Sequence, residues 1–246
     1  MIIDLIYERR NLLACSLTCR SWYMATFPHL HHTLTTLNSW TVWYPPKSLW
    51  PKPLRDMHRL GLLPSVKKFR VLEDGRLPPK EFSPQLFNSR ILRHFFALTN
   101  VQELGIDYLN IPKFMPRIRR YFGHFSPTVR SLALRAPIGS RRQIIYFIGL
   151  FQHLEDLKLL YEMGDFQGEP VDDLTLIPPS APPLRGRLTM TCFMRTGLLK
   201  DMINLFGGIR FRHLDLWNVE GMRLLLGACA ETLETLRLYP TDPRGE

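Results

Sequence analysis

Long apolar runs are absent from this sequence of 246 residues. The longest candidate covers residues 144–151 and closely follows charge at Arg141 and Arg142, whereas a membrane span needs about 20 apolar residues. The N-terminal residues also lack the basic start, the apolar stretch and the small-residue cleavage site of a secretory signal. We therefore expect a soluble protein with no membrane partner, located in the cytoplasm, the nucleus or both.

Cysteine is scarce and dispersed, at positions 15, 19, 192 and 229. Four such cysteines do not make a disulfide framework, and none has zinc-finger spacing with suitable histidines, so a reducing compartment is expected. Cys15 and Cys19 have the spacing to share a metal on a helix, but small apolar core residues explain them better. His29, His31 and His32 have no cysteine or acidic ligand nearby, which favours a surface turn. We expect no metal and no cofactor.

Catalytic and nucleotide-binding motifs are also missing. The sequence contains no G-x-S-x-G, no Walker loop, no G-x-G-x-x-G and no H-E-x-x-H. A site assembled from distant residues is still compatible with the sequence, but no local motif points to one. We therefore predict no enzyme and assign no catalytic residue.

Charge is uneven, although the sum is +10. Residues 51–150 hold 18 basic and 6 acidic side chains, whereas residues 151–246 hold 10 and 14. The basic runs at residues 117–120 and 141–142 would suit nucleic acid or an acidic protein. We favour a solvated helix face, because no nucleic-acid-binding motif accompanies the charge, and keep a basic nucleic-acid-binding protein as an alternative.

Apolar residues are plentiful, at 45%, which allows one elongated domain or a domain with a small helical appendage. Residues 11–25 contain neither glycine nor proline, and we predict one helix that Pro28 closes. This helix would carry two apolar stripes, one formed by Leu12, Cys15, Cys19, Trp22 and Tyr23, the other by Leu13, Leu17 and Met24. One stripe could face the rest of the chain and the other a second protein, or both could be internal. Residues 35–60, with four prolines between 44 and 53, are predicted to be a connector.

A repeated template, apolar-x-x-apolar-x-apolar, dominates the remaining residues 61–246. It occurs as Val101-Gln-Glu-Leu-Gly-Ile106 and also at residues 66–71, 129–134, 154–159, 211–216 and 233–238, and with one inserted residue at 184–190. The mean step of about 28 residues is at the upper end of the range for leucine-rich repeats. We therefore predict the α/β class, with an irregular leucine-rich-repeat solenoid of about seven repeats, parallel strands and helices on the convex side.

Helix starts in the intervals agree with this prediction. Ser140 and Gln143 form a capping box before an apolar run. Ser83 before Pro84, Thr196 and Asn218 are further candidate N-caps. Each interval would therefore bring the chain back along one sheet face and leave the other face open.

Side chains between the inward apolar residues of each strand should line the open face, because they alternate along a strand. The wider lining includes Lys68, Arg70, Glu103, Asp107 and Asp156. Trp217 and Tyr239 fall in one column, and exposed adjacent aromatics are typical binding anchors, although a following loop could bury them instead. The predicted partner-binding residues are Arg135, Lys158, Leu160, His213, Asp215, Trp217, Arg237 and Tyr239.

The run Leu12-Leu-Ala-Cys-Ser-Leu-Thr-Cys-Arg-Ser-Trp22, followed by Ala25 and Leu30, resembles the second half of an F-box. Such a segment is found in fungal F-box proteins that carry divergent leucine-rich repeats, which this chain therefore resembles. The resemblance implies that residues 1–34, a partial F-box, dock on a SKP-family adaptor and through it on a cullin, while the repeats recruit an unknown protein substrate for ubiquitination. It implies the adaptor-binding residues Ile2, Ile3, Leu5, Ile6, Leu13, Leu17 and Trp22.

This F-box is incomplete, because the family's opening Leu-Pro pair is absent before Ile2 and the stretch leading to Leu12 is short. Two hypotheses therefore stand. In the first, the chain is the substrate-recognition subunit of a cullin-based ubiquitin ligase of the SCF type. In the second, it is an orphan or truncated repeat scaffold with the same binding surface and no ligase association.

Overall fold

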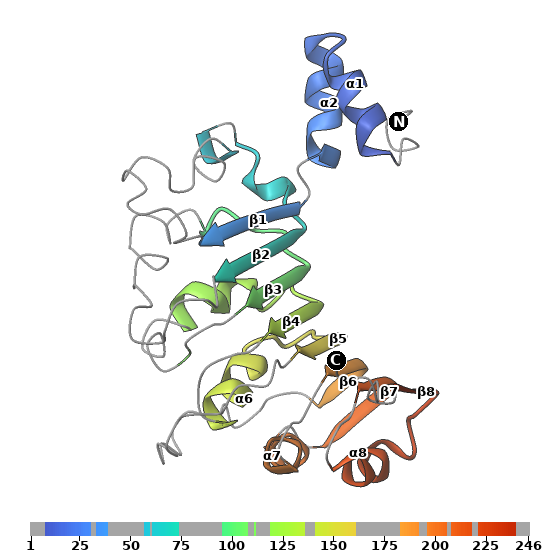
Figure 1. Cartoon of the computed structure of the whole chain (residues 1–246). Helices are drawn as coiled ribbons and strands as arrows, with labels where there is room; N and C mark the ends of the chain where they lie inside the picture. Colours follow the sequence, from blue (N-terminus) through green and yellow to red (C-terminus); the bar gives the residue numbers. More distant parts are fainter. Residues whose placement is uncertain are drawn as a thin grey trace.

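A parallel sheet of eight strands organises the chain in the computed structural model (Figure 1). The structure describes residues 8–30, 33–38, 57–59, 61–73, 95–107, 111, 119–135, 141–160, 183–191, 196–205, 208–217 and 221–239. The strands are β1 (Thr33–Asn38), β2 (Lys68–Glu73), β3 (Glu103–Asp107), β4 (Ser131–Arg135), β5 (Asp156–Leu160), β6 (Leu184–Thr191), β7 (Ile209–Trp217) and β8 (Thr235–Tyr239). Each pairs in parallel with the next along the chain. The predicted α/β class and the solenoid-like order of its strands are confirmed.

Helices follow one another along one side of this sheet (Figure 1). They are α6 (Arg141–Gly149), α7 (Thr196–Leu205) and α8 (Met222–Cys229), with the short 3₁₀ helices η2 (Leu63–Ser65) and η4 (Gly123–Phe125) in earlier intervals. Helix α6 begins directly after Ser140 and α7 begins at Thr196, close to two of the predicted caps. Helix α8 differs from the prediction, because its N-cap is Gly221, with φ 80°, and not Asn218. No described helix is long and apolar enough to cross a membrane.

The template explains why strands form where they do. Burial alternates along β4 and β5, so that Leu132 and Leu134, and then Leu157 and Leu159, point into the core. The register places Leu132 beside Leu157 and Leu134 beside Leu159, so equivalent leucines stack from strand to strand. All seven predicted copies of the template coincide with strands, from β2 to β8.

Strand β1 lies partly in the predicted connector, so the boundary drawn at residue 61 is wrong for the start of the sheet. In the strand register Leu34 stands opposite Phe69, and Thr36 stands opposite Val71. A threonine at this register position breaks the apolar pattern of the template, although threonine is a residue type that suits strands. The template therefore missed β1.

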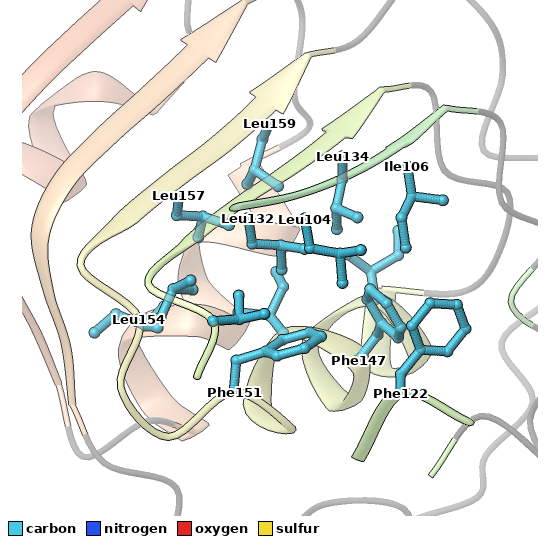
Figure 2. Packing of buried hydrophobic residues seen from close by; sticks show 14 of the residues in the cluster. Leu104, Ile106, Phe122, Leu132, Leu134, Phe147, Phe151, Leu154, Leu157 and Leu159 are labelled. Carbon is cyan, nitrogen blue, oxygen red and sulfur yellow. The ribbon is translucent and has the colours of Figure 1, made fainter. Parts of the chain in front are cut away.

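Phenylalanines join the sheet to the helical layer. Phe69 of β2 packs edge-on against Phe95, with ring centroids 5.0 Å apart, and Phe122 packs edge-on against Phe147 of α6 at 5.2 Å. Figure 2 shows Phe122, Phe147 and Phe151 on the same side as the leucines of β3, β4 and β5. Burying a side chain of this size stabilises the fold by about 1.5–3 kcal/mol. These ring contacts therefore connect neighbouring intervals in the first half of the sheet, from β2 to α6.

The N-terminal segment is a helical hairpin, not the single helix predicted from residues 11–25. Helix α1 (Arg9–Ser16) and helix α2 (Arg20–Leu30) pack on each other, and the chain turns between them. The hydroxyls of Ser16 and Thr18 donate hydrogen bonds to the carbonyls of Leu13 and Cys15, both at 2.7 Å. Such local bonds compete with continuation of the helix, which explains the break.

Pro28 lies inside α2 and does not close it. A proline within a helix removes one backbone donor. In the turn before it, the hydroxyl of Thr26 donates to the carbonyls of Trp22 and Tyr23, at 2.8 Å and 3.2 Å. The helix nevertheless continues for two residues beyond the proline, to Leu30.

Candidate functional site

The side of the sheet away from the helices, here called the open face, is made of three columns of outward side chains. Strand register defines them. The first column holds Lys68, Glu103, Ser131, Asp156, Arg187, His213 and Thr235; the second holds Arg70, Gly105, Ala133, Lys158, Thr189, Asp215 and Arg237; the third holds Asp107, Arg135, Leu160, Thr191, Trp217 and Tyr239. All eight partner-binding residues predicted from the sequence therefore share one face.

The contribution of β6 to this face was missing from the prediction. Arg187, Thr189 and Thr191 occupy the three columns there, but the inserted residue in the β6 template obscured which side chains point outward. The pairing with β7 shifts beside it: Gly186, with φ +83°, stands opposite Phe211, and Arg187 stands opposite His213, so that Arg212 of β7 is the extra residue. A glycine inside an apolar template is the signal that could have located this bulge.

Charges near the start of the sheet are matched one to one. Lys68 Nζ lies 2.8 Å from Glu103 Oε1, and Arg70 Nη2 lies 2.9 Å from Asp107 Oδ2. Gly105 makes room for the second pair, because a Cβ at that position would lie 3.1 Å from Arg70 Cγ. In the middle of the face, Asp156 accepts from the hydroxyl of Ser131 at 3.0 Å and contacts Lys158 Nζ at 3.0 Å.

The charge balance changes at the other end of the open face. There Arg187 Nε and Arg237 Nε both approach Asp215, at 3.9 Å and 3.8 Å from its two carboxylate oxygens. Asp215 is only 13% exposed, whereas the side chains of Arg187 and Arg237 are 49% and 61% exposed. Two exposed guanidinium groups therefore share one covered carboxylate.

Two aromatic rings lie beside this group, in the third column. Trp217 and Tyr239 stack face to face, with ring centroids 4.0 Å apart and planes 6° apart. Trp217 is half-buried and Tyr239 is exposed. The two rings thus form the adjacent pair predicted from the sequence, and the side chain of Tyr239 remains accessible to a second molecule.

The hairpin carries a second apolar surface, here called the hairpin surface: Leu13, Leu17, Trp22, Tyr23 and Met24. All five side chains are exposed, and Leu17 in the turn reaches 86%. Leu12 and Leu30 are buried in a small cluster apart from the main core, and the partly buried Ala25 packs against them. The predicted stripes do not run on through the segment, because the turn interrupts them and leaves Cys19 exposed. Ile2, Ile3, Leu5 and Ile6 lie outside the described residues.

The basic runs are only partly open to a partner. Arg119 and Arg120 are exposed, while Arg141 Nε of α6 lies 3.6 Å from Asp201 Oδ2 of α7 and so links two helices. In the part of the chain that the structure describes, no group of three or more histidine, cysteine or acidic side chains is placed to hold a metal ion.

Comparison with known proteins adds no relative, since no family model, curated protein or solved structure matches the chain. The resemblance of residues 12–30 to an F-box therefore rests on the residues of this sequence.

Proposed function

We propose that this protein is a non-enzymatic leucine-rich-repeat module that recruits a protein substrate to an SCF-type ubiquitin ligase. The hairpin surface docks on a SKP-family adaptor, which connects it to a cullin, and the open face binds the substrate. Ubiquitin transfer occurs on other subunits. The observation that carries this proposal is the hairpin surface, five large apolar side chains exposed on an element with its own small core.

Sequential parallel strands support the leucine-rich-repeat part of this proposal. From β2 onward each strand carries the apolar template, and the described helices α6, α7 and α8 lie along one side of the sheet (Figure 1). Repeats of this kind leave the opposite face uncovered and use it to bind other proteins. The open face, with its exposed charges and its aromatic stack, suits that role.

The position of the hairpin supports the adaptor part. Helices α1 and α2 stand beyond β1, at the end of the sheet opposite to α7 and α8 (Figure 1). Within the described residues, the hairpin surface has no element packed over it. Five large apolar side chains exposed on one short hairpin are typical of protein interaction sites.

The second candidate function is a repeat scaffold that binds the same partner without a ligase. The open face favours it, because its exposed arginines and stacked aromatic rings suit a protein partner whether or not the hairpin surface contacts an adaptor. The two candidates share the open face and differ only in what the hairpin surface contacts.

Calorimetric titration of the full chain with a SKP-family adaptor tests the proposal. The double variant Leu13→Ser/Leu17→Ser removes two exposed leucines and should weaken binding at least about tenfold, the effect of losing roughly 1.4 kcal/mol of contact energy. Leu224→Ser is the matched control, because Leu224 on α8 is 43% exposed, close to the 48% of Leu13. This control should bind the adaptor as the unchanged chain does.

A version with a restored Leu-Pro segment separates the two candidates. If only that version binds the adaptor, the scaffold function stands for this chain. If neither version binds, or if Leu224→Ser weakens binding as much as the hairpin variant, adaptor docking by the hairpin is wrong. Circular dichroism of each variant checks that the helices remain folded.

A further inference from the structure

The two ends of the open face differ in how closely their basic side chains are paired with acidic ones. Near β2 and β3, Lys68 and Arg70 each have an acidic partner within 3 Å. Near β6 to β8, two arginines share Asp215 at 3.8 Å and 3.9 Å, beyond hydrogen-bonding distance. Since both contacts run through Nε, the terminal amino groups of these guanidiniums can donate to a second carboxylate.

The cationic pair and the aromatic pair have a fixed spacing. Trp217 follows Asp215 by two residues on β7, and Tyr239 follows Arg237 by two residues on β8. Residues two apart on a strand point to the same face, roughly 6.6 Å from one another. A carboxylate and a ring on a second extended chain have the same separation when a single residue lies between them.

We propose that the β6–β8 end of the open face binds an extended segment of the partner that carries an acidic residue, any residue, and then an aromatic residue. The acidic side chain lies between Arg187 and Arg237, and the aromatic side chain packs against the exposed Tyr239 of the stacked pair. This inference rests on the proposed function only in that the open face binds a protein.

Charge complementarity favours an acidic peptide over a nucleic acid at this end. Nucleic-acid binding draws its affinity from several phosphate contacts at once. Here Asp215 and, two strands away, Asp156 place negative charge on the same face as Arg187, Arg237 and Lys158. This balance suits one or two carboxylates better than a chain of phosphates.

The indole N–H signal of Trp217 in the full ¹⁵N-labelled chain reports binding directly. It is identified among the five tryptophans by its loss in Trp217→Phe. The probe is a synthetic peptide with Glu-Ser-Phe in a Gly-Ser background, titrated to a few millimolar. Matched peptides carry Lys-Ser-Phe, Glu-Ser-Ala, or Glu and Phe without the spacer, and a short oligouridine tests nucleic acid.

We expect the Glu-Ser-Phe peptide to shift this signal in a saturable way, with each matched peptide at least about tenfold weaker. Arg187→Glu/Arg237→Glu should abolish the shift. Arg212→Glu is the control variant, since Arg212 lies on β7, between the strands of the two arginines, pairs with Glu234 at 3.6 Å and is outside the three columns. This variant should bind the peptide as the unchanged chain does.

Three results would overturn the inference: no shift with any peptide, equal shifts with all of them, or a tighter response to oligouridine that the arginine variants remove. A failed adaptor titration would not overturn this inference, because the peptide titration contains no adaptor. The Leu13→Ser/Leu17→Ser chain should bind the Glu-Ser-Phe peptide normally.

Discussion

Replacing Leu157 with aspartate should unfold the middle of the sheet. Leu157 is 1% exposed and lies between Leu132 on β4 and Leu188 on β6, both fully buried. Removing a buried leucine side chain costs about 2–5 kcal/mol of unfolding free energy. A carboxyl group without partners at the same place adds roughly 2 kcal/mol or more. The sum approaches the total stability of an ordinary domain, about 5–15 kcal/mol.

Leu160→Asp provides the matched control, since it makes the same substitution on the same strand. Leu160 belongs to the third column of the open face and is half-buried. Its replacement leaves the carboxylate in contact with water, beside Arg135 in the register. A surface change of this kind should alter the unfolding free energy by about 1 kcal/mol or less.

Urea unfolding followed by circular dichroism measures the difference, and hydrogen exchange resolves where it arises. Repeats contact mainly their neighbours, so faster exchange after Leu157→Asp should centre on β4, β5 and β6. Equal losses of stability in the two variants would refute the assignment of faces on β5. An unchanged urea midpoint in Leu157→Asp would refute the burial of this position.

Two further predictions concern the backbone and the pH. Gly186→Ala should lower the free energy of unfolding by more than about 2 kcal/mol, because φ is +83° and a Cβ would overlap the carbonyl of Glu155. Gly61→Ala is the control, since Gly61 has φ +68° but open space around it. In the same urea titration it should cost only about 1 kcal/mol. Burial lowers the pKa of His124 below 6.5, against smaller opposing contributions from the backbone oxygens of Phe95 and Tyr121. As the pH drops below 6.5, His124 is protonated more readily in the unfolded chain than in the folded chain. The free energy of unfolding should therefore fall with decreasing pH, and His124→Gln should reduce this dependence.

Much of the sheet could be predicted from the sequence, because one short apolar pattern indicates both where a strand lies and which of its side chains are buried. In Leu154-Glu-Asp-Leu-Lys-Leu159, the apolar residues fix which side of β5 is buried. Parallel pairing with equivalent residues then aligns the outward side chains of neighbouring strands. That is why Trp217 and Tyr239 could be placed in one column from the sequence, and the structure shows them stacked.

The parts that were missed depend on competition between local interactions. Thr36 in β1 breaks the apolar pattern without breaking the strand, because pairing with β2 supplies the hydrogen bonds. The hydroxyls of Ser16 and Thr18 end α1 in a segment whose composition favours a continuous helix. Neither outcome can be predicted by counting apolar residues. The first depends on the backbone hydrogen bonds between β1 and β2, and the second on the hydrogen bonds of the Ser16 and Thr18 hydroxyls.

The register shift between β6 and β7, opposite Gly186, shows how one such local event affects the open face. The extra residue is Arg212 of β7, because Ile209 and Phe211 are buried before it and Leu214 and Leu216 after it. Without this residue, Asp215 and Trp217 would change sides and point into the core. Burial along β6 alternates without a break, so the shift places Asp215 beside Arg187 on the open face. A substitution at Gly186 should lower stability and acidic-peptide binding together, whereas Arg187→Glu should lower binding alone.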